Sequence, residues 1–466
     1  MDYTKKIADF ITETGYESIP SKALEVAKMA IFDSVGVTLA GSKEASGRIC
    51  GQLVRDEKSN GEATLIGQGF KSSALMAAFA NGTSAHALDY DYSFALMGQP
   101  TAGLLAAILP LAESLRRSGR EVLEAFVVGF EVTAKLARTT PALSGKGGWH
   151  STGTLGSLGA AAACAKILRL NTREVQMTLG IASSMASGIV WNFGTMTKPL
   201  HAGLASRNGV LAARLAQYGF SANPLILEAH NGFYDTFSRD LPCDLTPLNS
   251  LGASLELLER GVKIKPYPCG GLAHSAIDAV LEMRATHGIA PQTVAAIEAG
   301  VTQHAHNRLI YRIPENGLQG KFSLPYVLAR ALIDGKLGLD GFTDEAVRDP
   351  LVLDLAEKVR VEVDPGLKQT WESSSPSQVT IRLRDGGSFS RRVDHPKGSP
   401  ELPLAPQELR AKFIECARRA LKERAAADAL ECLAHLESLS DLKPLCESLI
   451  GEAPSVTDPS EVVKPT

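Results

Sequence analysis

Apolar residues in the first half of the chain recur every three or four positions, the spacing that places side chains on one face of a helix. Ile7, Phe10 and Ile11 share one such face, and the apolar residues of 23–31 share another. The same Ala- and Leu-rich pattern continues to about residue 235, with few alternating β-branched residues. We therefore predict that this half of the chain is helical.

The pattern changes near residue 262, where the Pro- and Gly-rich stretch KIKPYPCGGLAH interrupts it. Strand-like runs follow at 294–301, 359–363 and 378–383, and the last one leads into Asp385-Gly386-Gly387, a sequence typical of a β-hairpin turn. The predicted fold is mainly α, with a smaller α+β lid domain inserted before the last helices. We assign a helical domain to 1–262, the lid to 263–395, helices that return to the helical domain to 396–450, and a tail to 451–466.

Three glycines lie close together within one predicted helix. Gly153, Gly156 and Gly159 recur every three residues and therefore lie near one helix face. No Lys-Ser or Lys-Thr pair follows them at the offset that a phosphate-binding loop requires. We interpret them as a site of close helix–helix contact.

Composition excludes several classes of protein. The 466 residues carry a net charge of −3, so the basic excess that holds nucleic acid is missing. Seven cysteines are odd in number, widely spaced and without a C-x-x-C pair, which favours neither disulfides nor a zinc or iron–sulfur site. The N-terminus lacks the pattern of a secretory signal, and no apolar run is long enough for a membrane span. We therefore expect a cytoplasmic protein.

Long stretches of the helical half contain almost no charge. From 72 to 112 the only charged residues are Asp89 and Asp91, and from 175 to 206 the only one is Lys198. A charge in apolar surroundings costs several kcal/mol unless it is paired or lies in a wet pocket, so these residues are functional candidates. The alternative is a buried ion pair between Lys198 and an aspartate that only holds helices together. Single histidines such as His86 and His201 are by default ordinary core residues.

Three basic residues lie at junctions between Gly- or Pro-rich loops and helices: His150, Lys198 and Lys265. Placed together, they could bind an anionic substrate and move protons. A Schiff base on Lys198 stays possible, whereas the G-x-S-x-G, H-E-x-x-H and P-loop motifs are missing. His304 and His306 could ligate a metal, but without an evident third ligand a surface pair is the better interpretation.

Five segments in the same order resemble the MmgE/PrpD family over about residues 5–450. They are AHALDYDYSF with GQP (85–100), GWHSTGTLGSLGAAAACAK (148–166), TKPLHAGLASRNG (197–209), IKPYPCGGLAH (264–274) and GKFSLPY (320–326). The resemblance implies a helical domain with an α/β lid, usually a homodimer, without a metal or organic cofactor. It also implies a small polycarboxylate substrate, as in 2-methylcitrate dehydratase, cis-aconitate decarboxylase and iminodisuccinate epimerase.

The resemblance also assigns site residues. The family's catalytic positions fall on Asp89, His150, Lys198 and Lys265. Its substrate-binding positions fall on Ser93, where the family has Thr, and on the lid residue Tyr326. Lys321 of the GKFSLPY segment and Gln99 complete the candidate substrate-binding set.

Gln99 departs from the family pattern, which has a histidine before the proline. An amide cannot donate or accept a full proton near neutral pH. Dehydration and decarboxylation both need such a group, whereas epimerisation needs only two opposed acid/base groups and cations that stabilise the enolate-like intermediate. The sequence therefore favours an epimerase that abstracts an α-proton, with Lys198 and His150 as the proton-transfer pair. A dehydratase- or decarboxylase-type lyase and a non-catalytic carboxylate-binding protein are the alternatives.

Overall fold

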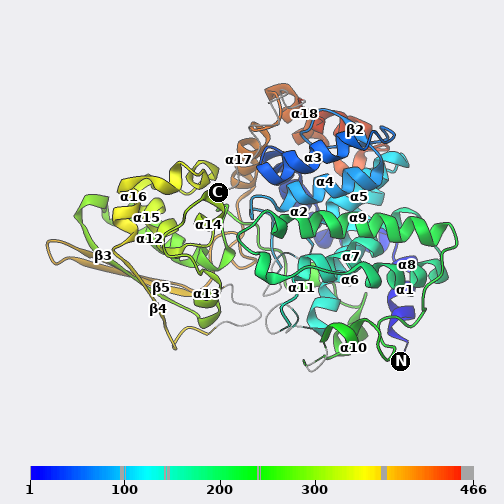
Figure 1. Cartoon of the computed structure of the whole chain (residues 1–466), viewed down its shortest axis with the longest axis horizontal. Helices are drawn as coiled ribbons and strands as arrows, with labels where there is room; N and C mark the ends of the chain where they lie inside the picture. Colours follow the sequence, from blue (N-terminus) through cyan, green and yellow to red (C-terminus); the bar gives the residue numbers. More distant parts are fainter. Residues whose placement is uncertain are drawn as a thin grey trace.

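The computed structural model describes residues 2–94, 99, 101–140, 143, 147–238, 241, 243–368 and 375–452. Two parts lie side by side: a large helical body and a smaller part that contains a β-sheet (Figure 1). This arrangement confirms the coarse prediction of a mainly helical chain with a small α+β portion. The predicted tail lies outside the described residues from 453 onward.

The helical body is built from both ends of the chain. Its helices are α1 (Tyr3–Glu13), α2 (Ser21–Gly41), α3 (Ala45–Asp56), α4 (Ala74–His86), α5 (Leu104–Ser114), α6 (Gly119–Thr139), α7 (Ser151–Ile167), α8 (Thr172–Met185), α9 (Thr197–Gln217), α10 (Phe233–Ser238) and α11 (Glu256–Glu259), and then α17 (Pro406–Ala417), α18 (Glu423–Ala434) and α19 (Lys443–Leu449). A short hairpin, β1 (Ala63–Thr64) with β2 (Lys71–Ser72), lies among them.

Helix α9 packs on both α4 and α7 in the middle of the body. They are apolar around most of their circumference, as expected for helices surrounded by protein. A Cβ on Gly159 would lie 1.8 Å from Thr133 Oγ1 of α6, and one on Gly153 would lie 2.1 Å from the Ser187 carbonyl oxygen. The predicted helix–helix contact is therefore confirmed for Gly159, whereas Gly153 lies against the segment that follows α8.

The smaller part is an α+β layer. Its sheet has the order β4-β3-β5-β6, in which β3 and β4 run parallel and the other neighbours antiparallel. The strands are β3 (Val294–Val301), β4 (Val359–Val363), β5 (Ser377–Leu383) and β6 (Ser388–Val393). Its helices are α12 (His274–His287), α13 (Gln303–Arg308), α14 (Gly317–Gly320), α15 (Leu324–Asp334) and α16 (Pro350–Ala356).

The strand predictions are confirmed, and so is the hairpin, whose turn places Gly386 at φ +92°. Such a backbone conformation is readily adopted by glycine. Helices α12 and α15 pack against each other and against the sheet, which buries the alternating apolar residues of β5.

Two separate hydrophobic cores occupy the two parts. One joins apolar residues between Ile7 and Ile264 with others between Leu404 and Leu449, and the second runs from Tyr267 to Ile381. Helix α17 packs on α2 and so ties the end of the chain to its beginning. The domain boundaries at 262, 395 and 450 stay a prediction. Within the described residues, no helix combines the length and apolarity that crossing a membrane would require.

Candidate active site

Asp89 is the centre of a buried charged cluster. It lies just after the C-terminus of α4 and has a left-handed backbone conformation, with φ +51°. Its carboxylate binds two ammonium groups, Lys198 Nζ at 2.6 Å from Oδ1 and Lys265 Nζ at 3.0 Å from Oδ2. All three side chains are more than nine-tenths buried. The ion pair that the sequence offered as a structural alternative therefore forms, but it belongs to a larger cluster.

Lys198 approaches from the first turn of α9. Its ammonium group also donates to His86 Nε2, at 2.9 Å, while His86 Nδ1 lies 3.1 Å from both carboxylate oxygens of Asp91. This geometry suits a neutral His86 that donates from Nδ1 to Asp91 and accepts at Nε2 from Lys198. Asp91 thus orients His86, and His86 orients Lys198.

Lys265 approaches from the segment that connects the two parts of the molecule. It donates to the Asp89 main-chain carbonyl at 2.6 Å as well as to the Asp89 carboxylate. Burial alone would raise the pKa of the Asp89 carboxyl, but the ammonium groups of Lys198 and Lys265 outweigh it and hold this pKa well below its usual range. Asp89 is therefore an anion that holds two cations in place.

His150 lies next to this cluster and is paired with a second histidine. The ring of His150 stacks on that of His86 with centroids 5.7 Å apart, and its Nδ1 lies 2.9 Å from Nδ1 of His201. Gly188 provides room for the pair, because a Cβ there would lie 3.3 Å from the His201 ring and 3.5 Å from His150 Cβ. Its φ of +122° also favours glycine.

Both paired histidines are held neutral. Burial lowers the pKa of His150, and the positive charge of Lys198 lowers it further. Burial and the positive charge of Lys198 lower the pKa of His201 to about 4. An Nδ1–Nδ1 hydrogen bond between neutral imidazoles requires one donor and one acceptor, so the tautomers of the two rings are coupled. The pair is suited to accept or deliver a proton at the edge of the cluster.

The substrate-binding candidates have different places in the structure. Gln99 Nε2 donates to Asp89 Oδ1 at 3.2 Å, and the main chain of Ser93 pairs with that of Lys263 in an isolated bridge. Lys321 Nζ donates to the carbonyl oxygens of Leu88 and Pro268, both at 2.9 Å, so it lies against the turn that carries Asp89. Burial lowers the pKa of Lys321 to about 8.

Tyr326 is not brought to the cluster. It is fully buried in the second core, and its hydroxyl donates to the carbonyl of Gly341. Tyr311 lies against the loop just before Lys198, since its hydroxyl oxygen would be 2.5 Å from a Cβ on Gly194. No described residue forms a hydrogen bond with that hydroxyl. The binding role of Tyr326 stays a prediction, and Tyr311 is a further candidate that the sequence reasoning did not single out.

The cluster is richer in cations than the sequence indicated. Lys263 is buried beside Lys265 with the Gly271 carbonyl as its acceptor at 3.1 Å, and Lys412 pairs with Asp33 at 2.6 Å. Burial and the neighbouring Lys265 lower the pKa of Lys263 to about 7. Such an excess of positive charge is suited to a substrate that carries several carboxylates.

A metal site fits the cluster poorly. Among the described residues, the only group with ligand-like spacing is His86, Asp89 and Asp91. Both carboxylate oxygens of Asp89 already face lysine ammonium groups, which would repel a divalent cation. His304 and His306 belong to no such group among these residues.

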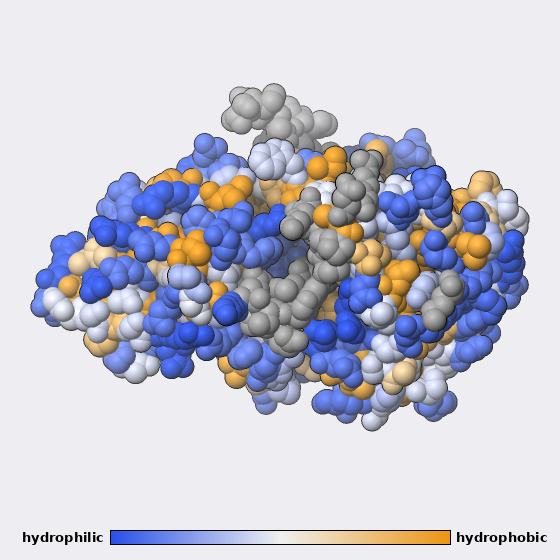
Figure 2. Space-filling model, turned by 90° about the horizontal axis from the view of Figure 1, so that it is seen from below, coloured by the Kyte–Doolittle hydropathy of each residue, from blue (hydrophilic) through white to orange (hydrophobic). Residues whose placement is uncertain are grey.

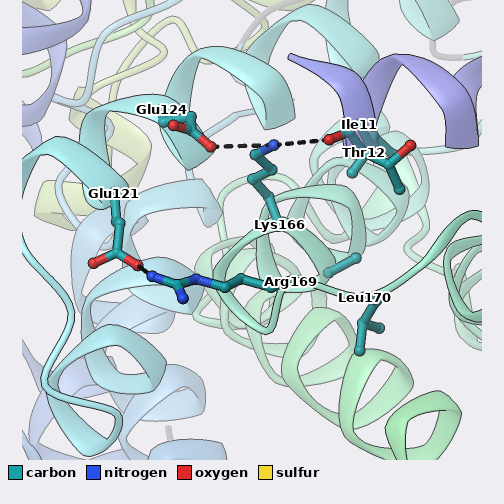
Figure 3. A pocket seen from close by; sticks show the side chains of 8 residues that line it. Ile11, Thr12, Glu121, Glu124, Lys166, Arg169 and Leu170 are labelled. Atoms are coloured by element: carbon teal, nitrogen blue, oxygen red, sulfur yellow. Dashed lines mark hydrogen bonds and ion pairs between the residues drawn. The ribbon is translucent and has the colours of Figure 1, made fainter. Parts of the chain in front are cut away.

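A hollow at a distance from the cluster offers a contrast. It has a volume of about 330 Å³ and lies between α1, α6 and α7 (Figure 3). Lys166 binds Glu124 and Arg169 binds Glu121 there, so its charges are already paired. The surface seen in Figure 2 is also hollowed between the helical body and the smaller part. The Asp89 cluster, which takes residues from both parts, is therefore the better candidate.

Fold and site together define a class of protein: a helical body joined to a small α+β part, with a buried lysine–histidine cluster between them. The chain belongs to the MmgE/PrpD family. Residues 5–246 match the model of the MmgE/PrpD N-terminal domain, and residues 267–437 match that of the C-terminal domain.

Several similar proteins are lyases by name. The chain is 29% identical to the cis-aconitate decarboxylase of Mus musculus over 98% of this chain and 94% of that protein. It is 27% identical to that of Aspergillus terreus, over 96% and 95%. It is 24% identical to the 2-methylcitrate dehydratase of Cupriavidus necator, over 87% and 89%.

Proposed function

We propose that this protein is a lyase that acts on a small tricarboxylate, with the decarboxylation of cis-aconitate as the first reaction to test. The decarboxylases named above match more of the chain, at higher identity, than the dehydratase does. The epimerase prediction that the sequence favoured finds no support among these relatives, and the lyase alternative replaces it. Dehydration of 2-methylcitrate is the second candidate, because a named dehydratase also covers most of the chain.

One observation carries the proposal: the unused donors of the two central lysines. An ammonium group has three N–H donors. Lys198 uses two of them on Asp89 and His86, and Lys265 uses two on the carboxylate and the carbonyl of Asp89. Each lysine therefore keeps one N–H that no described residue accepts. Two such donors, fixed by one aspartate, form a receptor for substrate carboxylates.

The same groups suit the chemistry of decarboxylation. When the carbon–carbon bond breaks and CO₂ leaves, its electron pair stays on the carbon skeleton and spreads over the neighbouring double bond and carboxylate. The ammonium groups of Lys198 and Lys265 stabilise this charge, and a proton must then be added to carbon. Lys198 is the proposed donor, because it is charged and is oriented by both Asp89 and His86.

His150 has a separate role in this scheme. As a neutral imidazole it can relay a proton to Lys198, taking one up at one ring nitrogen as it gives one from the other, or, in the dehydration alternative, remove a proton from the substrate. Gln99 stands where the family pattern has a histidine that can donate a proton. In this scheme Lys198 therefore acts as the acid. Ser93, Gln99 and Tyr311 are proposed to form hydrogen bonds with the substrate.

Assembly and location belong to the same proposal. The family resemblance supports a homodimer, which light scattering on the purified protein would test. The seven cysteines are free thiols, in keeping with a reducing cytoplasm.

Proton NMR with purified protein tests the reaction. Incubation with cis-aconitate should replace its vinyl signal by the two methylene protons of a terminal double bond, with release of CO₂. Replacement of the methyl doublet of 2-methylcitrate by the singlet of a methyl group on a double bond would establish the dehydratase instead. Interconversion of iminodisuccinate stereoisomers in D₂O with deuterium uptake would restore the epimerase. Saturable binding without any turnover would mean a non-catalytic carboxylate-binding protein.

A variant pair connects this activity to the cluster. Lys198→Gln should lower kcat by about 10³-fold, because it removes both the cation and the proton donor. Lys166→Gln is the matched control: Lys166 also forms an ion pair, with Glu124 at 3.1 Å, but lies at the far end of α7. Retained activity in Lys198→Gln would overturn the assignment.

A further inference from the structure

Three consecutive carbonyl oxygens around Asp89 each accept a hydrogen bond from a different buried lysine. Lys321 donates to Leu88 at 2.9 Å, Lys265 to Asp89 at 2.6 Å, and Lys412 to Tyr90 at 2.9 Å. The three lysines come from the smaller part, the connecting segment and helix α17. These carbonyl groups belong to the turn in which Asp89 has φ +51°.

A left-handed conformation is unfavourable for a residue with a Cβ, and it persists only where the surroundings fix it. The carboxylate of Asp89 can face Lys198 and Lys265 only while this turn is kept. The lysines that donate to the main-chain carbonyl groups of this turn therefore determine how the Asp89 carboxylate is placed in the site.

Lys412 has the most connections of the three lysines. Besides the Tyr90 carbonyl, it donates to the Lys265 carbonyl at 2.9 Å, and it pairs with Asp33 of α2 at 2.6 Å. The side chains of Lys412 and Asp33 are at least 95% buried. Asp33 in turn accepts a hydrogen bond from the main-chain N–H of Tyr92 at 3.1 Å.

The Asp33–Lys412 ion pair thus holds the backbone on both sides of Asp91. It also holds the backbone of Lys265, the second lysine of the site. None of its described contacts reaches the Asp89 carboxylate itself. We propose that Asp33 and Lys412 are positioning residues, which fix the Asp89 turn and the Lys265 backbone so that the two lysine donors converge on a substrate carboxylate. The turnover part of this inference rests on the proposed function; the backbone part does not.

The control is a buried ion pair of the same kind elsewhere. Lys135 is fully buried in α6 and pairs with Glu256 at 2.8 Å, with no site residue among its described partners. The full-length variants are Lys412→Met, Lys135→Met and the double variant Asp33→Asn with Lys412→Met. The double variant leaves no uncompensated buried charge, so it keeps the test open if Lys412→Met alone does not fold.

Two measurements are compared with wild type. Hydrogen–deuterium exchange of the 86–94 and 263–269 segments should be faster in the Lys412 variants and unchanged in Lys135→Met. With cis-aconitate, kcat per folded molecule should fall by about a hundredfold in the Lys412 variants, with a smaller change in KM, as expected when reacting groups are misplaced by about an ångström. Lys135→Met should keep the wild-type kcat.

Each outcome decides one question. Wild-type exchange and wild-type kcat in the folded double variant would overturn the positioning role, and so would an equal loss in Lys135→Met. Faster exchange in the Lys412 variants supports the positioning role even if the wild type turns over no substrate, a result that would refute the proposed function alone.

Discussion

Replacing His201 by asparagine should make the folded protein less sensitive to mild acid. His201 is buried against His150 and faces the positive charge of Lys198, and these surroundings lower its pKa from 6.5 to about 4. The side-chain amide of asparagine reaches about as far as Nδ1 of histidine, so the contact with His150 can be kept. The substitution therefore removes a titrating group with little change in packing.

The size of the effect follows from the two pKa values. As the pH falls below 6.5, the unfolded chain protonates this histidine while the folded chain does not, so the free energy of unfolding decreases down to about pH 4. One pKa unit corresponds to about 1.4 kcal/mol. Between about pH 7 and pH 5, the free energy of unfolding of the wild type should therefore fall by about 2 kcal/mol more than that of the variant.

Urea denaturation at about pH 7, 6 and 5 measures this difference directly. The gap between variant and wild type should change by about 2 kcal/mol over this range, in favour of the variant at low pH. His230→Asn is the control, because the His230 side chain is 87% exposed. Parallel pH profiles for wild type and His201→Asn would refute the view that His201 is held neutral.

Three further predictions concern the same region. Asp89→Asn should destabilise the fold by about 3–5 kcal/mol at neutral pH, since two buried lysines lose their counter-charge. In urea denaturation, the difference in the free energy of unfolding from wild type should shrink only below about pH 4, where the carboxyl group of the unfolded wild type protonates. Gly153→Ala should lower the free energy of unfolding by about 1–3 kcal/mol, because the new Cβ would lie 2.1 Å from the Ser187 carbonyl oxygen. Since Gly153 lies in the first turn of α7, just after His150, kcat should fall as well. Wild-type thermal unfolding and turnover would contradict this. Tyr311→Phe should lower kcat/KM by at least about tenfold with unchanged thermal unfolding, because its hydroxyl has no described partner to lose and, in the proposed scheme, forms a hydrogen bond with the substrate.

The sequence was sufficient to predict the features that depend on local pattern. The strands at 294–301 and 359–363, the Gly386 hairpin and the close helix–helix contact at Gly159 follow from periodicity and turn chemistry, and the structure confirms them. Isolated charges in apolar sequence also indicated residues that the fold brings together. Asp89 and Lys198 stood out because so few charges surround them in the sequence.

Contacts between distant segments could not be predicted in this way. Lys412 lies in ELRAKFIECARR, a charged helix that looks like a surface helix, and only the packing of α17 on α2 buries it. His201 looked like an ordinary core histidine, because its partner His150 is 51 residues away in the chain. The epimerase prediction gave too much weight to the single residue Gln99, whereas similarity over nearly the whole chain favours the lyases.

The hydrogen bonds that three lysines donate to the carbonyl groups of residues 88–90 also have a consequence for biosynthesis. Chains fold as they leave the ribosome, beginning at the N-terminus. The Asp89 turn is made early, yet Lys412 follows Tyr90 by 322 residues. Until α17 emerges, Asp33 lacks the cation that pairs with it and the Tyr90 carbonyl lacks its donor. The site is therefore completed only after residue 412 has been made, and a nascent chain that stops before residue 412 should be inactive even when many of its helices have formed.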